Sequence, residues 1–231
     1  MLLEYNKFKK TCVIINASQK KIKKIFFLKK NSDSKINFKN EIAGNKWYFR
    51  KLQIKNISKK FHNINYSSNY ITLPYYQGYQ LKFWKSIRYS SKIIDEVLRH
   101  YIKVWPVKKK VAYHGDLSLS NIIFFRDKKK LRIIDWENFK KNECWGLDIC
   151  YFLLSLLILP SLGRKKITIH PNEIKLFSYY WRSFFKNKKY KYLSDPINYL
   201  KKKKLINKEN FIYKINSKQE SQIKKIIYEI Y

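Results

Sequence analysis

Acidic residues, cysteine and glycine are scarce in this chain of 231 residues, and each shortage narrows what the protein can be. It has 16 Asp+Glu against 51 Lys+Arg, a formal net charge of +35, so a strongly cationic substrate would be repelled. The three cysteines are scattered without a C-x-x-C spacing, which argues against a zinc site or a disulfide framework and fits a reducing compartment. Only five glycines are present, and the first is Gly44, so no glycine-rich loop precedes it.

Long apolar runs are also missing. The most apolar stretch, 149–159, is too short to cross a bilayer, and we expect it to be a buried helix. Residues 1–7 lack the apolar run of a signal peptide. We therefore expect a cytoplasmic protein without a membrane span. Hydrophobic residues make up 45% of the chain, which favours a folded core over disorder.

The positive charge has two explanations. Such a field attracts polyanions, including nucleic acid, anionic lipid and phosphorylated small molecules. Nearly all of the charge is lysine, however, and isoleucine, asparagine and tyrosine are abundant beside it. These residues have AT-rich codons, so a low-GC genome could produce the same bias. Charge alone does not name a ligand, although peripheral contact with an anionic membrane would be compatible with it.

Hydrophobic periodicity places strands early in the chain and helices late, which indicates the α+β class. Segments rich in β-branched and aromatic residues predict strands at 11–18 and 24–29, a strand within 70–78 that ends in a Pro/Gly-punctuated connection, and a hairpin of 122–125 with 131–134. Apolar stripes at helical spacing predict helices at 36–52, 90–104, 149–159, 174–185 and 219–231. A Pro/Gly-punctuated connection after residue 73 divides the chain into a small lobe, 1–73, and a larger helical lobe, 74–231.

The most informative segment reads His-Gly-Asp at 114–116 and continues to Asn121, and Asp135 follows the predicted hairpin. The hairpin would bring Asp135 back beside Asn121. Asp116 is a carboxylate that could accept the proton of an attacking hydroxyl, and the amide and second carboxylate are oxygen ligands suited to Mg²⁺. This combination is what phosphoryl transfer from ATP requires.

The chain resembles the aminoglycoside phosphotransferase / choline kinase superfamily, a branch of the protein-kinase-like fold. Three motifs in order carry the resemblance: H-G-D-x-x-x-x-N at 114–121, I-D-W-E at 134–137 and G-L-D-I at 146–149. It is firm over about 111–157 and implies a bilobal fold with a small β-rich N-lobe and a larger, mostly helical C-lobe, using ATP and Mg²⁺.

The resemblance also implies roles for individual residues. Asp116 would be the catalytic base, and Asn121 and Asp135 would hold Mg²⁺. His114 would brace the catalytic loop without moving protons, and Asp148 would cap its helix and accept backbone hydrogen bonds from that loop. Glu137 stays open between contact with metal or acceptor and pairing with a lysine.

In the small lobe, the resemblance implies a strand lysine that reaches the ATP phosphates. Lys29 fits this role because strand alternation puts it on the same face as Phe27, and Glu41 on the next helix would hold its ammonium. A surface lysine is the alternative. Leu73, Tyr75 and Tyr76 would lie nearest the adenine, although a plain interlobe linker explains them nearly as well.

One departure from the family concerns the segment that covers the phosphates, which normally carries glycine. Either 16–23 does this without glycine, or the small lobe is trimmed. A trimmed lobe would weaken ATP binding and favour a pseudokinase that binds nucleotide without turnover.

The predicted function is therefore an ATP- and Mg-dependent kinase for a hydroxyl of a small molecule. A neutral or anionic acceptor, such as a sugar or glycan, is favoured because the C-terminal region has few acids: Glu143, Glu173, Asp195 and Glu209. Aromatic residues could stack on a sugar ring, although at helical spacing they are more often core: Tyr179, Tyr180, Trp181, Phe184 and Phe185. The alternatives are a choline, ethanolamine or thiamine kinase-like enzyme, the pseudokinase, and a basic protein that binds nucleic acid or a membrane surface. No specific nucleic-acid partner is expected.

Overall fold

The structure is a computed structural model that describes residues 2–6, 11–28, 33–53, 65–67, 69–81, 90–125, 130–162, 169–206, 208 and 210–230. The described strands are β1 (Leu2–Asn6), β2 (Thr11–Asn16), β3 (Lys21–Phe26), β4 (Asn65–Tyr66), β5 (Tyr70–Pro74), β6 (Lys110–Tyr113), β7 (Ile122–Phe125), β8 (Lys130–Ile133) and β9 (Lys140–Cys144). The described α-helices are α1 (Asp33–Gln53), α3 (Ser90–Val104), α4 (Leu147–Leu162), α5 (Pro171–Phe185), α6 (Pro196–Lys202) and α7 (Ser217–Ile230). Mixed helices and antiparallel sheets agree with the predicted α+β class.

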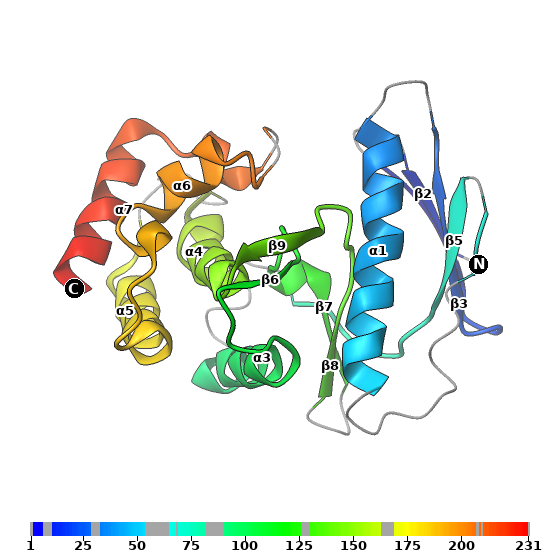
Figure 1. The fold of residues 1–231 in the computed structure, drawn as a ribbon, viewed down its shortest axis with the longest axis horizontal. Helices are drawn as coiled ribbons and strands as arrows, with labels where there is room; N and C mark the ends of the chain where they lie inside the picture. Colours follow the sequence, from blue (N-terminus) through cyan, green and yellow to red (C-terminus); the bar gives the residue numbers. More distant parts are fainter. Residues whose placement is uncertain are drawn as a thin grey trace.

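Five strands form an antiparallel sheet in the order β1-β2-β3-β5-β4. The turn between β2 and β3 is tight, with the amide of Lys20 donating to the Ala17 carbonyl at 3.1 Å. Lys20 has a φ of 51°, so a lysine takes the left-handed conformation that glycine often supplies. Helix α1 lies along this sheet, between it and the rest of the molecule (Figure 1).

The predicted strand 24–29 is displaced, because β3 is Lys21–Phe26. Phe26 is fully buried against Phe38 of α1, whereas Phe27 is 46% exposed. Phe26 therefore fixes the phase of the strand, and alternation places Lys24 on the same inward face. The exposure of Phe27 corrects the face that the sequence favoured. Lys29 lies outside the described residues.

Helix α1 joins the sheet to the remainder of the chain. A Cβ at Gly44 would lie 2.5 Å from Cβ of Trp136, so glycine lets the helix approach the I-D-W-E segment closely. One turn on, Trp47 and Tyr48 pack against Trp136, with ring centroids 5.9 and 5.1 Å away. The Tyr48 hydroxyl also accepts the amide of Ile133 in β8 at 3.2 Å. The inward face of α1 thereby fixes the position of the segment that follows β8.

The hairpin of β7 and β8 confirms the prediction for 122–125 with 131–134, apart from a shift of one residue in the second strand. Ile122 pairs with Ile133, and the amide of Ile134 donates to the Asn121 carbonyl at 3.0 Å. Asp135 is consequently carried back next to Asn121. A second pair, β6 with β9, was not predicted, and it brings Tyr113 opposite Lys140.

Helix α4 lies deep in the helical part (Figure 1), and nearly all of its residues are buried. This confirms the buried-helix interpretation of 149–159. Along the described part of the chain, no helix combines the length and apolarity that a membrane crossing requires. The predicted helices 90–104, 174–185 and 219–231 correspond to α3, α5 and α7. In α5, Tyr180, Trp181 and Phe185 are buried core residues, whereas Tyr179 is 65% exposed.

Candidate active site

The loop after β6 has a backbone conformation that depends on Gly115 and His114. Gly115 has a φ of 86°, and a Cβ there would lie 2.6 Å from the Asn138 carbonyl oxygen, so other residues would be strained. The ring of His114 is fully buried, accepts the Asp116 amide at Nδ1 (3.2 Å) and donates from Nε2 to the Ile134 carbonyl (2.9 Å). Both ring nitrogens are thus engaged with backbone, as the predicted bracing role requires.

Asp148, in the first turn of α4, holds the same loop from the other side. Its carboxylate accepts the His114 amide at 2.9 and 3.0 Å and the Gly115 amide at 3.1 Å. The predicted hydrogen bonds to the loop are therefore present. Burial raises the pKa of Asp148 to about 7, against the opposing effect of the His114 and Gly115 amides. Asp148 is a positioning group for the loop.

Asp116 and Asn121 contact each other directly. The amide nitrogen of Asn121 donates to Oδ2 of Asp116 at 3.0 Å and to its backbone carbonyl at 2.7 Å. Because Nδ2 makes these bonds, Oδ1 of the same amide is directed away from Asp116. Through the hairpin bond to Ile134, Asn121 also neighbours Asp135. The structure thus brings the predicted base and the two predicted metal ligands together.

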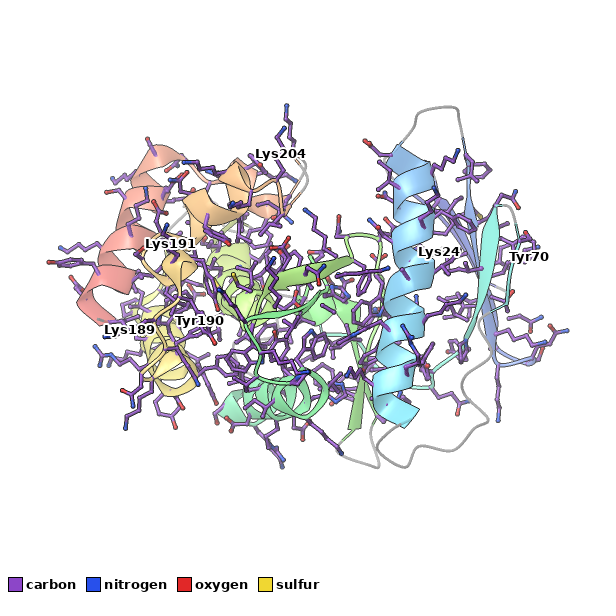
Figure 2. The ribbon with its side chains drawn as sticks, viewed as in Figure 1. Lys24, Tyr70, Lys189, Tyr190, Lys191 and Lys204 are labelled. Carbon is purple, nitrogen blue, oxygen red and sulfur yellow. The ribbon has the colours of Figure 1, made fainter. Side chains whose placement is uncertain are left out.

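Asp135 has a φ of 64°, a conformation that costs most side chains free energy and that aspartate tolerates better than most. Its Oδ1 accepts the ammonium of Lys24 at 2.7 Å, across 111 residues of sequence. The same ammonium lies 3.0 Å from Glu41 and 2.7 Å from Glu137. We call these four residues the Lys24 cluster. It connects β3, α1 and the I-D-W-E segment, and Figure 2 shows Lys24 beside α1.

The cluster is buried and held by further bonds from α1. Lys24, Glu41 and Glu137 are 8%, 1% and 2% exposed. Asn45 donates to the side chain of Glu41 at 2.8 Å, and Asn40 donates to the Glu137 carbonyl at 2.9 Å. Because buried charges are costly unless paired, a paired group of this kind is a strong candidate for function.

In the Lys24 cluster, burial and neighbouring charges shift the pKa values of Lys24 and Glu41. Burial alone would lower the pKa of Lys24, but the carboxylates of Asp135, Glu41 and Glu137 outweigh it and hold that pKa well above its usual value. Lys24 is therefore a cation at any physiological pH. Burial raises the pKa of Glu41, against the opposing effect of Lys24.

The residues suit a divalent cation by the chemistry of their donor atoms. Ligand oxygens of Glu41, Asp135 and Glu137 lie within 4.8 Å of one another. Asn121, beside Asp135, adds an amide oxygen. Carboxylate and amide oxygens are the ligands that Mg²⁺ prefers, and this ion is held by a few such groups together with phosphate oxygens.

The predicted nucleotide-contacting residues have mixed outcomes. Glu41 pairs with Lys24. The sequence-based choice, Lys29, lies outside the described residues, so its pairing with Glu41 stays a prediction. Leu73 is half-buried and packs beside the cluster of Phe26, Phe38 and Ile71. Tyr75 is half-buried, and its amide donates to the Lys20 carbonyl at 2.9 Å.

Tyr76 is 9% exposed and packs edge-on against Phe125, so its side chain belongs to the core. The Tyr76 ring is also near the guanidinium of Arg132, and burial raises the pKa of the Tyr76 hydroxyl to about 12. The contact of residues 73–76 with adenine stays a prediction.

Three contributors were not predicted or were left open: Lys24, Glu137 and Tyr151, whose hydroxyl donates to Asp116. For Lys24, the alternation of Ile22, Lys24 and Phe26 was a usable signal once Phe26 is taken as the buried residue. For Tyr151, its place three residues after Asp148 on one helix was the available clue.

Comparison with known proteins gives no family assignment. No protein-family model matches the chain, and no curated protein matches it at a significant level.

Proposed function

We propose that the chain is an ATP- and Mg-dependent phosphotransferase with a two-lobed, kinase-like fold that phosphorylates a hydroxyl of a small molecule. The observation that carries the proposal is a set of contacts that connects Asp116 to Asn121, Asn121 to Ile134 next to Asp135, and Asp135 through Lys24 to Glu41. These residues come from four separate segments. An ammonium, a base and oxygen ligands in one place are the parts that phosphoryl transfer needs.

Each residue has a role that its contacts support. Asp116 accepts the proton of the acceptor hydroxyl. At the same time the hydroxyl oxygen forms a bond to the γ-phosphorus, and the bond between that phosphorus and the ADP oxygen breaks. Asn121 and Asp135, with Glu137 close by, would hold Mg²⁺, which when bound to ATP neutralises phosphate charge. Lys24, held by Glu41, would orient the phosphates. His114 and Asp148 keep the loop of Asp116 in place.

The acceptor is proposed to be a sugar or a glycan-type alcohol. Two of the four acids on which the sequence argument rested, Glu173 and Asp195, already have structural partners, which makes them less available to line a pocket for a cation. Glu173 accepts the His170 amide at 2.8 Å in the capping box of α5. Asp195 caps α6 through the Asn198 amide at 3.2 Å and pairs with Lys224. Glu209 lies outside the described residues. A choline-type acceptor therefore has less support.

A pseudokinase is the second candidate, and the turn between β2 and β3 favours it. Asn16 uses its side-chain oxygen within this turn, accepting Ser18 at 2.8 Å and the Gln19 amide at 3.0 Å. The turn residues are exposed and lack glycine. A turn whose polar groups already bond to one another in this way is poorly suited to bind the phosphates of ATP.

The test compares Asp116→Ala and Asp135→Ala with the parent and with Asp95→Ala, an exposed aspartate of α3, as the control. Asp116→Ala should lower phosphoryl transfer by about 10³-fold while Mg-ATP still raises the melting temperature. Asp135→Ala should abolish that rise. Transfer is measured as ADP release with a panel of sugars, amino alcohols and nucleosides.

Equal turnover in Asp116→Ala and the parent would overturn the assignment of the base. A parent that binds Mg-ATP without turnover would identify the pseudokinase. If heparin stabilised the parent and both variants alike and Mg-ATP did nothing, a polyanion-binding protein would be the correct conclusion instead.

A further inference from the structure

Helix α4 touches the catalytic loop at two points, and the second has no role in the function proposed above. Asp148 receives the loop amides. Three residues later, on the same face of the helix, the hydroxyl of Tyr151 donates to Oδ1 of Asp116 at 2.5 Å. The first contact fixes the backbone of the loop, and the second reaches the side chain of the base itself.

The Tyr151 hydroxyl belongs to a chain of hydrogen bonds with a single direction. The Ile212 amide donates to Oδ1 of Asn210 at 3.1 Å, and Nδ2 of Asn210 donates to the Tyr151 oxygen at 2.7 Å. Since that oxygen accepts from Asn210, its own hydrogen is left to point at Asp116. Bonds aligned in one direction strengthen one another. Burial, together with the charge of Asp116, raises the pKa of Tyr151, so it remains a protonated donor.

The two carboxylate oxygens of Asp116 are held by two different donors. Oδ1 accepts from Tyr151 and Oδ2 accepts from Asn121. A carboxylate held at both oxygens cannot rotate without breaking a bond. Each carboxylate oxygen has two lone-pair sites, so one donor at an oxygen does not by itself prevent that oxygen from accepting a second hydrogen bond.

We propose that Tyr151, oriented by Asn210, is a positioning residue that fixes the rotation of the Asp116 carboxylate for proton transfer. This inference rests on the proposed function. In this proposal Asn210, which follows α6, acts on the catalytic base through Tyr151. Helix α4 supplies the phenol, and Asn210 sets the direction of its hydroxyl hydrogen.

The phenol also has a purely structural interpretation, and a second tyrosine separates the two. Tyr180 of α5 is 2% exposed and donates its hydroxyl to the Ser91 carbonyl at 2.7 Å. Tyr151→Phe and Tyr180→Phe remove the same atom from two buried rings, each with one donated bond. The first variant keeps the ring contact of Tyr151 with Phe211, whose centroid is 5.4 Å away.

The experiment measures kcat, the KM for ATP and the pH dependence of kcat in the parent and in both variants. ADP release from Mg-ATP is followed with the panel acceptor of highest turnover, or with water where none responds. Tyr151→Phe should lower kcat about tenfold and leave the KM for ATP within twofold. The acid limb of its pH profile should move up by about one pH unit, because the carboxylate loses a donor that favours its charged form. Asn210→Ala should shift the limb in the same direction by less.

Tyr180→Phe should keep the parent's kcat and pH profile even if its melting temperature falls. An active parent whose kcat and acid limb are unchanged in Tyr151→Phe overturns the inference and leaves the proposed function intact. Equal shifts in both tyrosine variants would also overturn it, since the effect would then be structural. A parent that transfers no phosphoryl group overturns the proposed function, and this inference falls with it.

Discussion

Lys24 and Lys224 each pair with more than one carboxylate, yet their surroundings differ. The ammonium of Lys24 lies within 3.0 Å of oxygens from Glu41, Asp135 and Glu137, and its side chain is 10% exposed. Lys224 of α7 lies 3.1 Å from Asp195 and 3.4 Å from Glu220, and its side chain is 44% exposed. Figure 2 shows Lys24 beside α1, and α7 lies in the helical part of the molecule (Figure 1).

The difference teaches that burial, and not the presence of an ion pair, marks the functional candidate. The chain has 51 Lys+Arg, so a lysine near an acid is expected by composition. An exposed pair is screened by water and contributes little. A buried cluster costs desolvation, and it persists where the surrounding structure holds every member. Lys24 meets this condition and Lys224 does not.

The largest expected effect is that of Lys24→Met, which keeps the length of the side chain and removes its charge. Three carboxylates would then face one another without that ammonium, and the unfolding free energy should fall by about 3–5 kcal/mol. The loss should shrink as the pH is lowered, because the carboxylates take up protons. Urea denaturation of the parent and the variant at pH 5 and pH 8 measures both quantities.

Two neighbouring lysines serve as controls for this variant. Lys23 is on the opposite face of β3, exposed, with its ammonium 4.0 Å from the ring of Tyr70. Lys23→Met should leave the response of the melting temperature to Mg-ATP unchanged, whereas Lys24→Met should remove it. Lys29→Met tests the sequence-based choice directly. If it removed the response while Lys24→Met retained it, the role given to Lys24 would be wrong.

The predictability of the site follows the distance between its residues in sequence. Asp116 and Asn121 are five residues apart, and a short hairpin brings Asp135 to them. The local sequence pattern was therefore sufficient to predict that these three residues lie together. Lys24 depends on the phase of a strand whose neighbours include several other lysines, and only the burial of Phe26 fixes that phase. Tyr151 and Asn210 are 59 residues apart, and no spacing rule connects them.

The elements of the fold also divide into those that the local sequence pattern predicts and those that depend on tertiary structure. Helices with a clear apolar stripe or an apolar run were predicted within a few residues, as for α3. Strand β9 was missed because its sequence, KKNEC, is polar and has no buried residue, so it lacks apolar alternation. Its pairing with β6 is decided by tertiary structure, so a local pattern could not reveal it.

A smaller effect is expected where a buried carboxylate is held by neutral donors, as at Asp148. Its pKa is raised to about 7 by burial, against the opposing effect of the His114 and Gly115 amides, so the folded state keeps a proton that the unfolded state releases near pH 4. Stability should therefore fall as the pH rises from about 4 to about 7, and level off above. Between pH 5 and pH 7 the change is about 2 kcal/mol.

Asp148→Asn isolates this contribution, since asparagine does not titrate. Its absolute stability also reflects the bond lost at Oδ2, so the readout is the slope of unfolding free energy against pH and not its value. The parent should lose stability over this range more steeply than the variant. Parallel slopes in urea denaturation would show that Asp148 is ionised throughout.

The smallest effect is expected for Lys224→Met, which repeats the largest substitution at the exposed cluster. Water screens Lys224 from Asp195 and Glu220, and the free side chains regain freedom when the pair is broken. The unfolding free energy should change by less than about 1 kcal/mol, and that change should diminish further in high salt. The response to Mg-ATP should equal that of the parent. A loss comparable to that of Lys24→Met would mean that ion pairing alone, whatever its burial, stabilises this lysine-rich chain, and the distinction between the two clusters would disappear.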